Sequence, residues 1–352
     1  MKRVRLCLSF FWLVMVLGCG SAPLIRSAGE IAPPPPPTHA GTLLFSTPQY
    51  HGQLTPTDDP QTYQFTLLNA AGKPLWHKHT HSNGIQIDPS ETYIALPAGT
   101  AASPILRGHN LHFFHVNGDS LGTWHGEFME YWLLPDSLCL INHFVPLDST
   151  QRWQITAVDP TGAVQWEIPT GNLLALEFRA YPQAHKFSFR LFDPDHHTFT
   201  SYLYNLKGEF IQRLESNPQQ TTRFIGVSPS GRWILSSAYP AEVRPETLPF
   251  RSQISIWDSL QVVDQMEVDG VVDFAGINDA GHYLTLITFE LDDPSGTSST
   301  PFLRVFDEDR RERYREPLNL DKIDVESVQF WYYSRKIKIT SNKHIDFEYT
   351  IQ

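Results

Sequence analysis

Short apolar segments separated by turn residues recur along the chain from about residue 41 onward. They have the length of strands, and no long segment shows the 3.6-residue periodicity of an amphipathic helix. Four of the turns contain a proline, and these prolines lie 46, 47 and 47 residues apart: Pro89, Pro135, Pro182 and Pro229. Two further turns follow at wider spacing, near Asn278 and Tyr333. This spacing predicts one structural unit of about 47 residues that is repeated along the chain.

Each unit has a second half with a common pattern. A strand leads to Asn or Asp, then to a small turn and to another strand that often carries Trp, as in residues 65–76, 113–124 and 155–166. Asn, Asp and Gly suit such turns because they tolerate left-handed backbone. Four short strands per repeat predict an all-β fold, a β-propeller over residues 41–352. Five complete units and two incomplete terminal ones favour seven four-stranded blades, and six blades are the alternative.

Two kinds of sequence motif connect these repeats to known families. Residues 227–236 (VSPSGRWILS) and 254–258 (ISIWD) resemble an inner hairpin and third strand of the WD40-like propellers of bacterial exported proteins, including the TolB type. Residues 72–76 (GKPLW) and 162–166 (GAVQW) look more like quinoprotein-type repeats. That second resemblance implies that Trp76 and Trp166 stack between neighbouring blades. The mixture leaves the subfamily open.

The N-terminal residues have the pattern of an export signal. Lys2, Arg3 and Arg5 precede an uncharged apolar run at residues 6–18, which is too short for a comfortable membrane span. The run ends in Val-Leu-Gly-Cys at residues 16–19, which resembles a bacterial lipoprotein signal. The resemblance implies a signal peptide at residues 1–18 and a lipid-modified Cys19. An ordinary secretory signal cleaved near Ala22 is the competing interpretation.

A proline-rich segment follows the expected anchor. Residues 19–40 contain five consecutive prolines, Pro33 to Pro37, which favour an extended and semi-rigid spacer. We therefore expect three parts: a signal at 1–18, a lipidated Cys19 with its linker at 19–40, and a propeller at 41–352. The mature chain would then retain Cys139 as its one thiol outside the anchor, with no partner for an intrachain disulfide.

Composition and charge exclude several classes of protein. The 352 residues are 41% hydrophobic and 12% aromatic, which is ample for a folded core. A net charge of -11, or -14 once the three basic residues of the signal are removed, argues against a nucleic-acid-binding surface. The chain contains no Gly-x-Ser-x-Gly elbow, no His-Glu-x-x-His zinc helix and no phosphate-binding glycine loop. These absences favour a protein that is not an enzyme, without settling the point.

One histidine cluster is a candidate metal site. His77, His79 and His81 alternate along a predicted strand and would project from one face. Imidazoles at this spacing can hold Zn²⁺ or Cu²⁺. However, the strand is expected to be the outermost one of its blade, so an exposed polar face is the favoured interpretation. We predict no cofactor, and metal at these histidines is the minor alternative.

The leading functional hypothesis is a lipid-anchored, monomeric propeller of the cell envelope that binds a protein, peptide or glycan. Loops carry such contacts on propellers, and the longest candidates are residues 48–60, 97–110, 238–251 and 290–301. Aromatic and arginine side chains make compact binding anchors, which favours a contact surface within the third of these loops. The predicted contact residues are Tyr239, Arg244, Phe250 and Arg251.

Two other functions stay open. The first is a propeller enzyme of the arylsulfotransferase-like or quinoprotein-like type, which would need titratable groups that converge near the propeller axis. The second is an accessory lipoprotein of outer-membrane assembly. Gly20, in place of Asp after the lipidated cysteine, is compatible with sorting to the outer membrane. We expect the outer membrane, with the protein on either the periplasmic or the cell-surface side.

Overall fold

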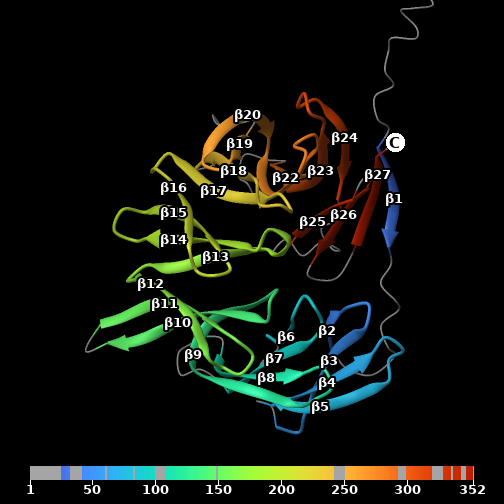
Figure 1. Cartoon of the computed structure of the whole chain (residues 1–352), viewed down its shortest axis with the longest axis vertical. Helices are drawn as coiled ribbons and strands as arrows, with labels where there is room; N and C mark the ends of the chain where they lie inside the picture. The colour runs from blue at the N-terminus through green and yellow to red at the C-terminus, as the bar shows by residue number, and fades with distance from the viewer. Residues whose placement is uncertain are drawn as a thin grey trace, which may run out of the picture.

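The computed structural model describes residues 25–31, 42–59, 62–81, 84–99, 106, 108–147, 150–241, 250–291, 299–318, 328–333, 336–341 and 346–351. Within these ranges the chain is almost entirely antiparallel β-structure, with one short 3₁₀ turn at Pro182–Ala184. No helix in the described part is long and apolar enough to cross a membrane. The fold is a β-propeller, as the sequence predicts, and its blades follow one another around the molecule (Figure 1).

The first three blades come from the N-terminal half of the chain. Blade 1 contains β2 (Thr42–Ser46), β3 (Tyr50–Pro56), β4 (Tyr63–Asn69) and β5 (Pro74–Thr80). Blade 2 contains β6 (Gln86–Ile87), β7 (Tyr93–Gly99), β8 (Gly108–His115) and the first half of β9 (Ser120–Leu134). Blade 3 contains the second half of β9, β10 (Leu138–Leu147), β11 (Thr150–Val158) and β12 (Val164–Gly171).

The other four blades complete the series. Blade 4 contains β13 (Leu174–Tyr181), β14 (Lys186–Asp193), β15 (Thr198–Asn205) and β16 (Phe210–Glu215). Blade 5 contains β17 (Gln220–Val227), β18 (Trp233–Pro240), β19 (Arg251–Asp258) and β20 (Gln261–Asp269). Blade 6 contains β21 (Val271–Ile277), β22 (Leu284–Leu291), β23 (Ser299–Phe306) and β24 (Glu312–Pro317). Blade 7 contains β25 (Val328–Tyr333), β26 (Lys336–Ser341), β27 (Asp346–Ile351) and β1 (Ile25–Ile31).

The long strand β9 resolves the blade count. It pairs with β8 from Ser120 to Phe128 and with β10 from Phe128 to Leu134, so blades 2 and 3 form one seven-stranded sheet. The six sheets of the described residues therefore contain seven four-stranded units. Six blades, the alternative from the sequence, would require counting this joined sheet once.

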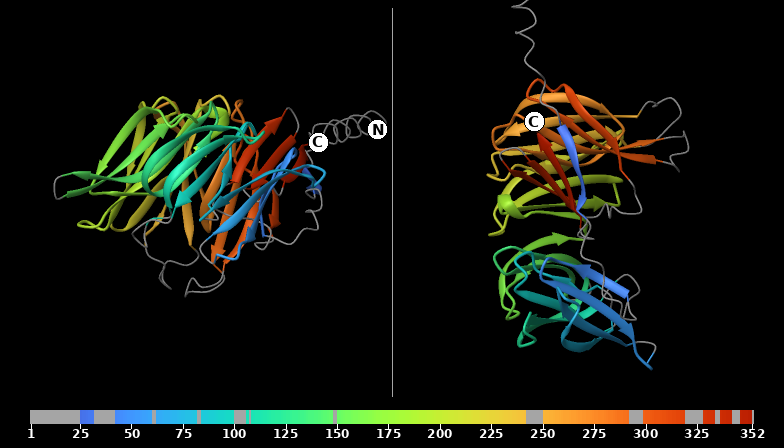
Figure 2. Two further views of the ribbon diagram at one scale, coloured as in Figure 1. Left: turned by 90° about the horizontal axis from the view of Figure 1, so that it is seen from below. Right: turned by 90° about the vertical axis from the view of Figure 1, so that its right-hand side faces the viewer.

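Strand β1 adds a fourth strand to blade 7 from outside residues 41–352. It lies in the segment 19–40 that the proline run predicts to be a linker, yet it pairs antiparallel with β27, with Ile25 opposite Ile351 (Figures 1 and 2). An outer strand leaves a row of N–H and C=O groups open, and β1 satisfies those of β27. The signal segment, Cys19 and the proline run lie outside the described residues.

The hydrophobic core lies between blades rather than within one layer. Each of the six consecutive interfaces, from blades 1 and 2 to blades 6 and 7, has its own cluster of buried apolar side chains. Inner strands contribute a buried phenylalanine to many of these clusters, among them Phe45, Phe128, Phe178 and Phe274. The cluster between blades 4 and 5 is small, with Leu203, Phe224 and Ile234 as its buried members.

Tryptophans join neighbouring blades in the way that the quinoprotein-type resemblance implies. Trp76 of β5 donates its Nε1–H to the Val116 carbonyl of blade 2 at 2.8 Å. Trp166 of β12 donates to the Leu206 carbonyl of blade 4 at 3.0 Å. In blade 5 the corresponding donor is Trp233, on the second strand, which bonds the Asp279 carbonyl of blade 6 at 2.9 Å. The two repeat types thus place Trp on different strands, but each Trp donates a hydrogen bond to a carbonyl of the next blade.

The antiparallel order of strands gives the propeller two unlike faces. In blades 1 to 6, tight turns join the first strand to the second and the third to the fourth, all on one face, which we name the turn face. The opposite side, where the second strand of a blade ends and the third begins, is named the loop face. The strands run between these two faces (Figure 2).

Gly208 provides a test of the tryptophan contacts. It has φ +79°, and a Cβ at this position would lie 2.7 Å from Cδ2 of Trp166. We expect Gly208→Ala to lower the free energy of unfolding by about 2–4 kcal/mol, because left-handed strain and displacement of the indole add together.

Gly171 offers a matched control. Its φ is +68°, and a Cβ there would meet nothing within 4 Å. We expect Gly171→Ala to cost only the backbone strain, about 1–2 kcal/mol. Urea unfolding of both variants measures the difference, and equal losses would show that the Trp166 contact adds nothing.

Candidate functional site

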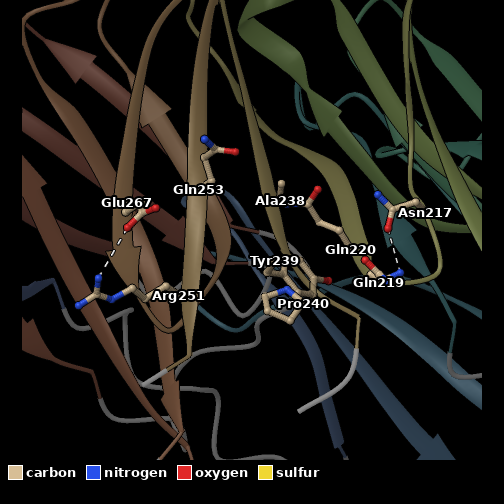
Figure 3. Close-up of a pocket in the computed structure, with 9 residues that line it drawn as sticks. All are labelled: Asn217, Gln219, Gln220, Ala238, Tyr239, Pro240, Arg251, Gln253 and Glu267. Atoms are coloured by element: carbon tan, nitrogen blue, oxygen red, sulfur yellow. Dashed lines mark hydrogen bonds and ion pairs between the residues drawn. The ribbon is translucent and has the colours of Figure 1, made fainter. Parts of the chain in front are cut away.

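A surface pocket of about 450 Å³ opens on the loop face of blade 5 (Figure 3). The residues that line it are mostly polar: Asn217, Gln219, Gln220, Ala238, Tyr239, Pro240, Arg251, Gln253 and Glu267. Those on strands come from the ends of β17, β18, β19 and β20 that meet on this face, and the first two belong to the connection from blade 4.

A tight turn fixes the wall on the side of blade 4. Asn217 Oδ1 accepts a hydrogen bond from the Gln219 N–H at 2.8 Å, and Asn217 and Gln220 exchange backbone hydrogen bonds at 3.0 and 3.1 Å. The Ser216 N–H donates to the Phe199 carbonyl at 2.9 Å, which ties this turn to β15. The amide side chains that face the pocket are therefore mounted on an ordered backbone.

The floor and the other wall come from the register of blade 5. Gln220 pairs with Pro240, which sets Pro240 and the adjacent Tyr239 side by side between the two walls (Figure 3). On the far wall, Arg251 Nη1 lies 3.6 Å from Glu267 Oε2, and Arg251 Nε lies 3.2 Å from Asp269 Oδ1. Both ion pairs are exposed and therefore contribute little to stability. The pocket is thus close to neutral, with an aromatic ring at its centre.

The side chains in this pocket suit recognition rather than bond chemistry. Amides of Asn and Gln each offer donors and an acceptor, so they can bind peptide backbone or sugar hydroxyls. Tyr239 is half-buried and adds an apolar face with a polar tip. The lining contains no histidine, cysteine or serine that could act as a base or nucleophile.

Two of the four predicted contact residues line this pocket, Tyr239 and Arg251. Phe250 does not line the pocket: its side chain is 3% exposed, and its ring packs against Tyr239 at 6.0 Å between centroids. Its position next to Arg251 at the start of β19 points it into the protein, because side chains alternate along a strand. Arg244 lies outside the described residues.

The three histidines of the candidate metal site lie on the outermost strand of blade 1 or just beyond it. His77 and His79 belong to β5, and all three side chains are exposed. Within the described ranges, no three His, Cys, Asp or Glu side chains are placed to hold a metal ion. Cys139 is a buried free thiol in β10, and burial raises the pKa of this thiol well above its usual value.

A second polar feature lies on the inner strands of blades 4, 5 and 6 and on the second strand of blade 4. We name it the inner ionic cluster, and its members are Glu177 and Arg179 of β13, Arg190 of β14, Arg223 of β17 and Asp273 of β21. Arg179 reaches past blade 5 to bond both the carbonyl and the carboxylate of Asp273 in blade 6. Such a contact requires the inner strands of three blades to converge.

The contacts within this cluster alternate in charge. Arg190 Nη1 donates to Glu177 Oε1 at 2.5 Å, and the other oxygen of Glu177 lies 3.6 Å from Arg223 Nη1. Arg223 also pairs with the Asp273 carboxylate and donates to the Val272 carbonyl at 3.0 Å. Three guanidinium groups face two carboxylates, which leaves one positive charge.

Arginine neighbours set the protonation of Glu177. Burial alone would raise the pKa of this carboxyl, but the hydrogen bond and charge of Arg190, followed by the charges of Arg223 and Arg179, hold it below its usual value. Its side chain is nevertheless 38% exposed, so solvent reaches the carboxylate.

The cluster and the pocket share one residue. The Arg223 guanidinium lies over the Tyr239 ring, 5.1 Å from its centroid, and Tyr239 also lines the pocket. The positive charge of the cluster is therefore one aromatic ring away from any ligand in the pocket.

Sequence reasoning missed the inner ionic cluster, although a signal for it exists. Three inner strands place a charged residue directly before phenylalanine, at 46- and 50-residue spacing: Glu177-Phe178, Arg223-Phe224 and Asp273-Phe274. The phenylalanines enter the cores between blades, so on an alternating strand their neighbours face elsewhere. Repetition of charge at one strand position could have marked these residues.

No family model matches the chain, and no curated protein sequence does. Solved structures with a similar fold include BamB from Moraxella catarrhalis, with a TM-score of 0.47, 9% identity and coverage of 93% of this chain and 100% of that chain. A eukaryotic initiation factor has a TM-score of 0.44 and 9% identity, and the match covers 85% of this chain and 96% of that chain. The Dos1 propeller has a TM-score of 0.43 and 9% identity, covering 94% of each. These likenesses concern the fold alone.

Glu177 gives a pH-dependent test of the cluster. Its pKa in the folded protein lies below the unfolded value of about 4.3, so the ionised carboxylate stabilises the fold at neutral pH. This contribution is lost as the pH falls through the folded value. We therefore expect Glu177→Gln to lower Tm at pH 7, with a difference from wild type that narrows below about pH 4.

Thermal unfolding between pH 3 and 7 measures this difference. Glu267→Gln is the control, because Glu267 is exposed and its partner Arg251 lies 3.6 Å away. We expect little change in Tm for this control at any pH. A Glu177→Gln difference that stays constant over the whole range would contradict the assignment.

Proposed function

We propose that the protein is a lipid-anchored propeller of the cell envelope that binds a protein segment through the pocket on the loop face of blade 5. The signal pattern at residues 1–18 and Cys19 support the anchor. The rigid antiparallel blades support a scaffold that presents loops. A glycan ligand and a role in outer-membrane assembly are the alternatives within the same class.

The observation that carries this proposal is the chemistry of the pocket lining. Asn217, Gln219, Gln220 and Gln253 place amide groups on both sides of Tyr239. An extended peptide offers N–H and C=O groups at regular intervals, and amide side chains can satisfy both kinds. Tyr239 and Pro240 offer apolar surface for one side chain of such a peptide.

The propeller-enzyme alternative now has a definite location. The inner ionic cluster supplies titratable groups from three blades, which this hypothesis requires. Its arginines and carboxylates, however, pair with one another, and the contacts among them include no histidine or nucleophilic side chain. Binding therefore has the stronger support.

Site-specific photo-crosslinking in the native cell envelope tests the pocket. A photoreactive amino acid at Gln219 or Gln253, both exposed, should give a discrete adduct that mass spectrometry identifies. The same amino acid at Lys207, an exposed position on the turn face of blade 4, is the control and should not give it. Tyr239→Ala, combined with the probe at Gln253, should reduce the adduct at least severalfold.

Two results would refute the pocket as the binding surface. One is an adduct of equal yield at Lys207, and the other is an adduct that Tyr239→Ala leaves unchanged. If the adduct is a glycan rather than a peptide, the pocket stands and the partner class changes.

The anchor has a separate test. Cys19→Ser removes the thioether-forming thiol, so we expect the protein to move from the membrane fraction to the soluble fraction after cell lysis. Detergent partitioning and mass spectrometry of the N-terminal peptide measure the change. If the wild-type peptide carries no lipid, the ordinary secretory signal is correct.

A further inference from the structure

Arg190 has a buried guanidinium in which three of the five N–H donors are unpaired. Its side chain is 5% exposed and lies in the interface between blades 4 and 5. Nη1 binds Glu177, whereas Nε and Nη2 are buried and have no hydrogen-bond partner in the protein. Unpaired donors on a buried charge cost free energy, so we expect a hydrogen-bond acceptor at this edge of the guanidinium.

Other arginines of this chain show what fits that edge. Arg232 uses Nε and Nη2 together to bind the carboxylate of Asp258, at 3.2 and 2.7 Å. Arg304 uses the same two nitrogens to bind the two oxygens of Glu312, at 3.2 and 2.6 Å. This edge matches a planar group with two oxygens, which is the geometry of a carboxylate.

We propose that the Nε and Nη2 edge of Arg190 is a binding site for a small carboxylate anion, held between blades 4 and 5. The burial of Arg190 limits the ligand to the size of formate or acetate. One oxygen of the anion accepts from Nε–H and the other from Nη2–H.

The charge of the surroundings favours an anion over a neutral occupant. Arg179, Arg190 and Arg223 outnumber Glu177 and Asp273 by one positive charge. Arg223 has an unpartnered Nε as well and is 8% exposed, so the cluster is short of acceptors at two points. One bound carboxylate makes the cluster neutral.

The contacts of Arg190 place the proposed site between blades 4 and 5, close to the wall of the pocket. Its guanidinium stacks on the Phe199 ring at 3.9 Å from the centroid, and the Phe199 carbonyl accepts the Ser216 N–H from the wall of the pocket. Ser201, opposite Arg190 in register, donates to the Thr222 carbonyl across the blade interface at 3.0 Å. The apolar cluster of this interface is small, with Leu203, Phe224 and Ile234 as its buried members.

The inference does not rest on the proposed function. A carboxylate at Arg190 would stabilise the propeller whatever the pocket binds, and an empty pocket would leave the site intact. The test below uses acetate alone, so its outcome and that of the crosslinking experiment are separable.

Thermal unfolding at pH 7 in sodium acetate and in sodium chloride of equal ionic strength tests the site. We expect a saturable rise in Tm with acetate, about 2 °C when its concentration is ten times Kd, and no saturable rise with chloride. Arg190→Lys keeps the charge but loses the two-nitrogen edge, so the rise should disappear. Arg232→Lys alters an equivalent edge that Asp258 already fills, so the rise should persist.

A crystal structure of the wild-type protein grown in acetate gives a direct answer even if Arg190→Lys does not fold. Both acetate oxygens should lie within hydrogen-bond distance of Arg190 Nε and Nη2. Ordered water at that edge in the presence of acetate would overturn the proposal. So would equal Tm curves in acetate and chloride, or a rise that Arg190→Lys retains.

Discussion

Blades 2 to 6 of this protein depend on both of their neighbours, because each of these four-stranded sheets carries buried apolar side chains on both faces. The buried clusters at the six consecutive interfaces take one face from each of two adjacent blades. A single blade removed from the series would expose both of its faces to water. The tryptophan hydrogen bonds from Trp76, Trp166 and Trp233 add direction to this packing, because each fixes one turn of the next blade.

This dependence explains which parts of the fold the sequence predicts. Repeating strands and turns reflect the packing that the blades share, so the propeller follows from spacing, whereas the contacts of Trp76 and Trp166 follow from the quinoprotein-type resemblance. Departures from the repeat are harder to see. Nothing local in residues 25–31 marks them as a strand, because their partner is β27 at the other end of the chain. The junction in β9 is hidden for the opposite reason, since an uninterrupted strand shows no turn between two blades.

The functional residues also differ in how far the sequence predicts them. Tyr239 and Arg251 are recognisable because they flank a long connection between strands, and the structure places both in one pocket. Phe250 also flanks this connection, but the alternation of side chains along a strand directs its ring into the protein. The inner ionic cluster joins residues from three repeats, so no single stretch of sequence contains it. Only a comparison of equivalent positions across repeats brings Glu177, Arg223 and Asp273 into view.

The interface between blades 4 and 5 differs from the rest in what it buries. Its small apolar cluster lies beside Arg190 and Arg223, whereas the flanking interfaces bury larger apolar clusters. Hydrophobic contacts fix spacing without regard to solutes, but unsatisfied donors bind particular chemical groups. The unpaired Nε and Nη2 donors of Arg190 are therefore the reason that we propose solute binding at this interface.

The pairing of β1 with β27 has a mechanical consequence. Tension from an anchored N-terminus would enter the fold at Ile25, which pairs with Ile351, and would be borne first by the hydrogen bonds of this one ladder. The same pairing delays completion of blade 7 until Ile25 and Ile351 can meet, because loop closure over such a distance comes late in folding. The blade nearest the expected tether is thus the last to form and the first to feel a pull.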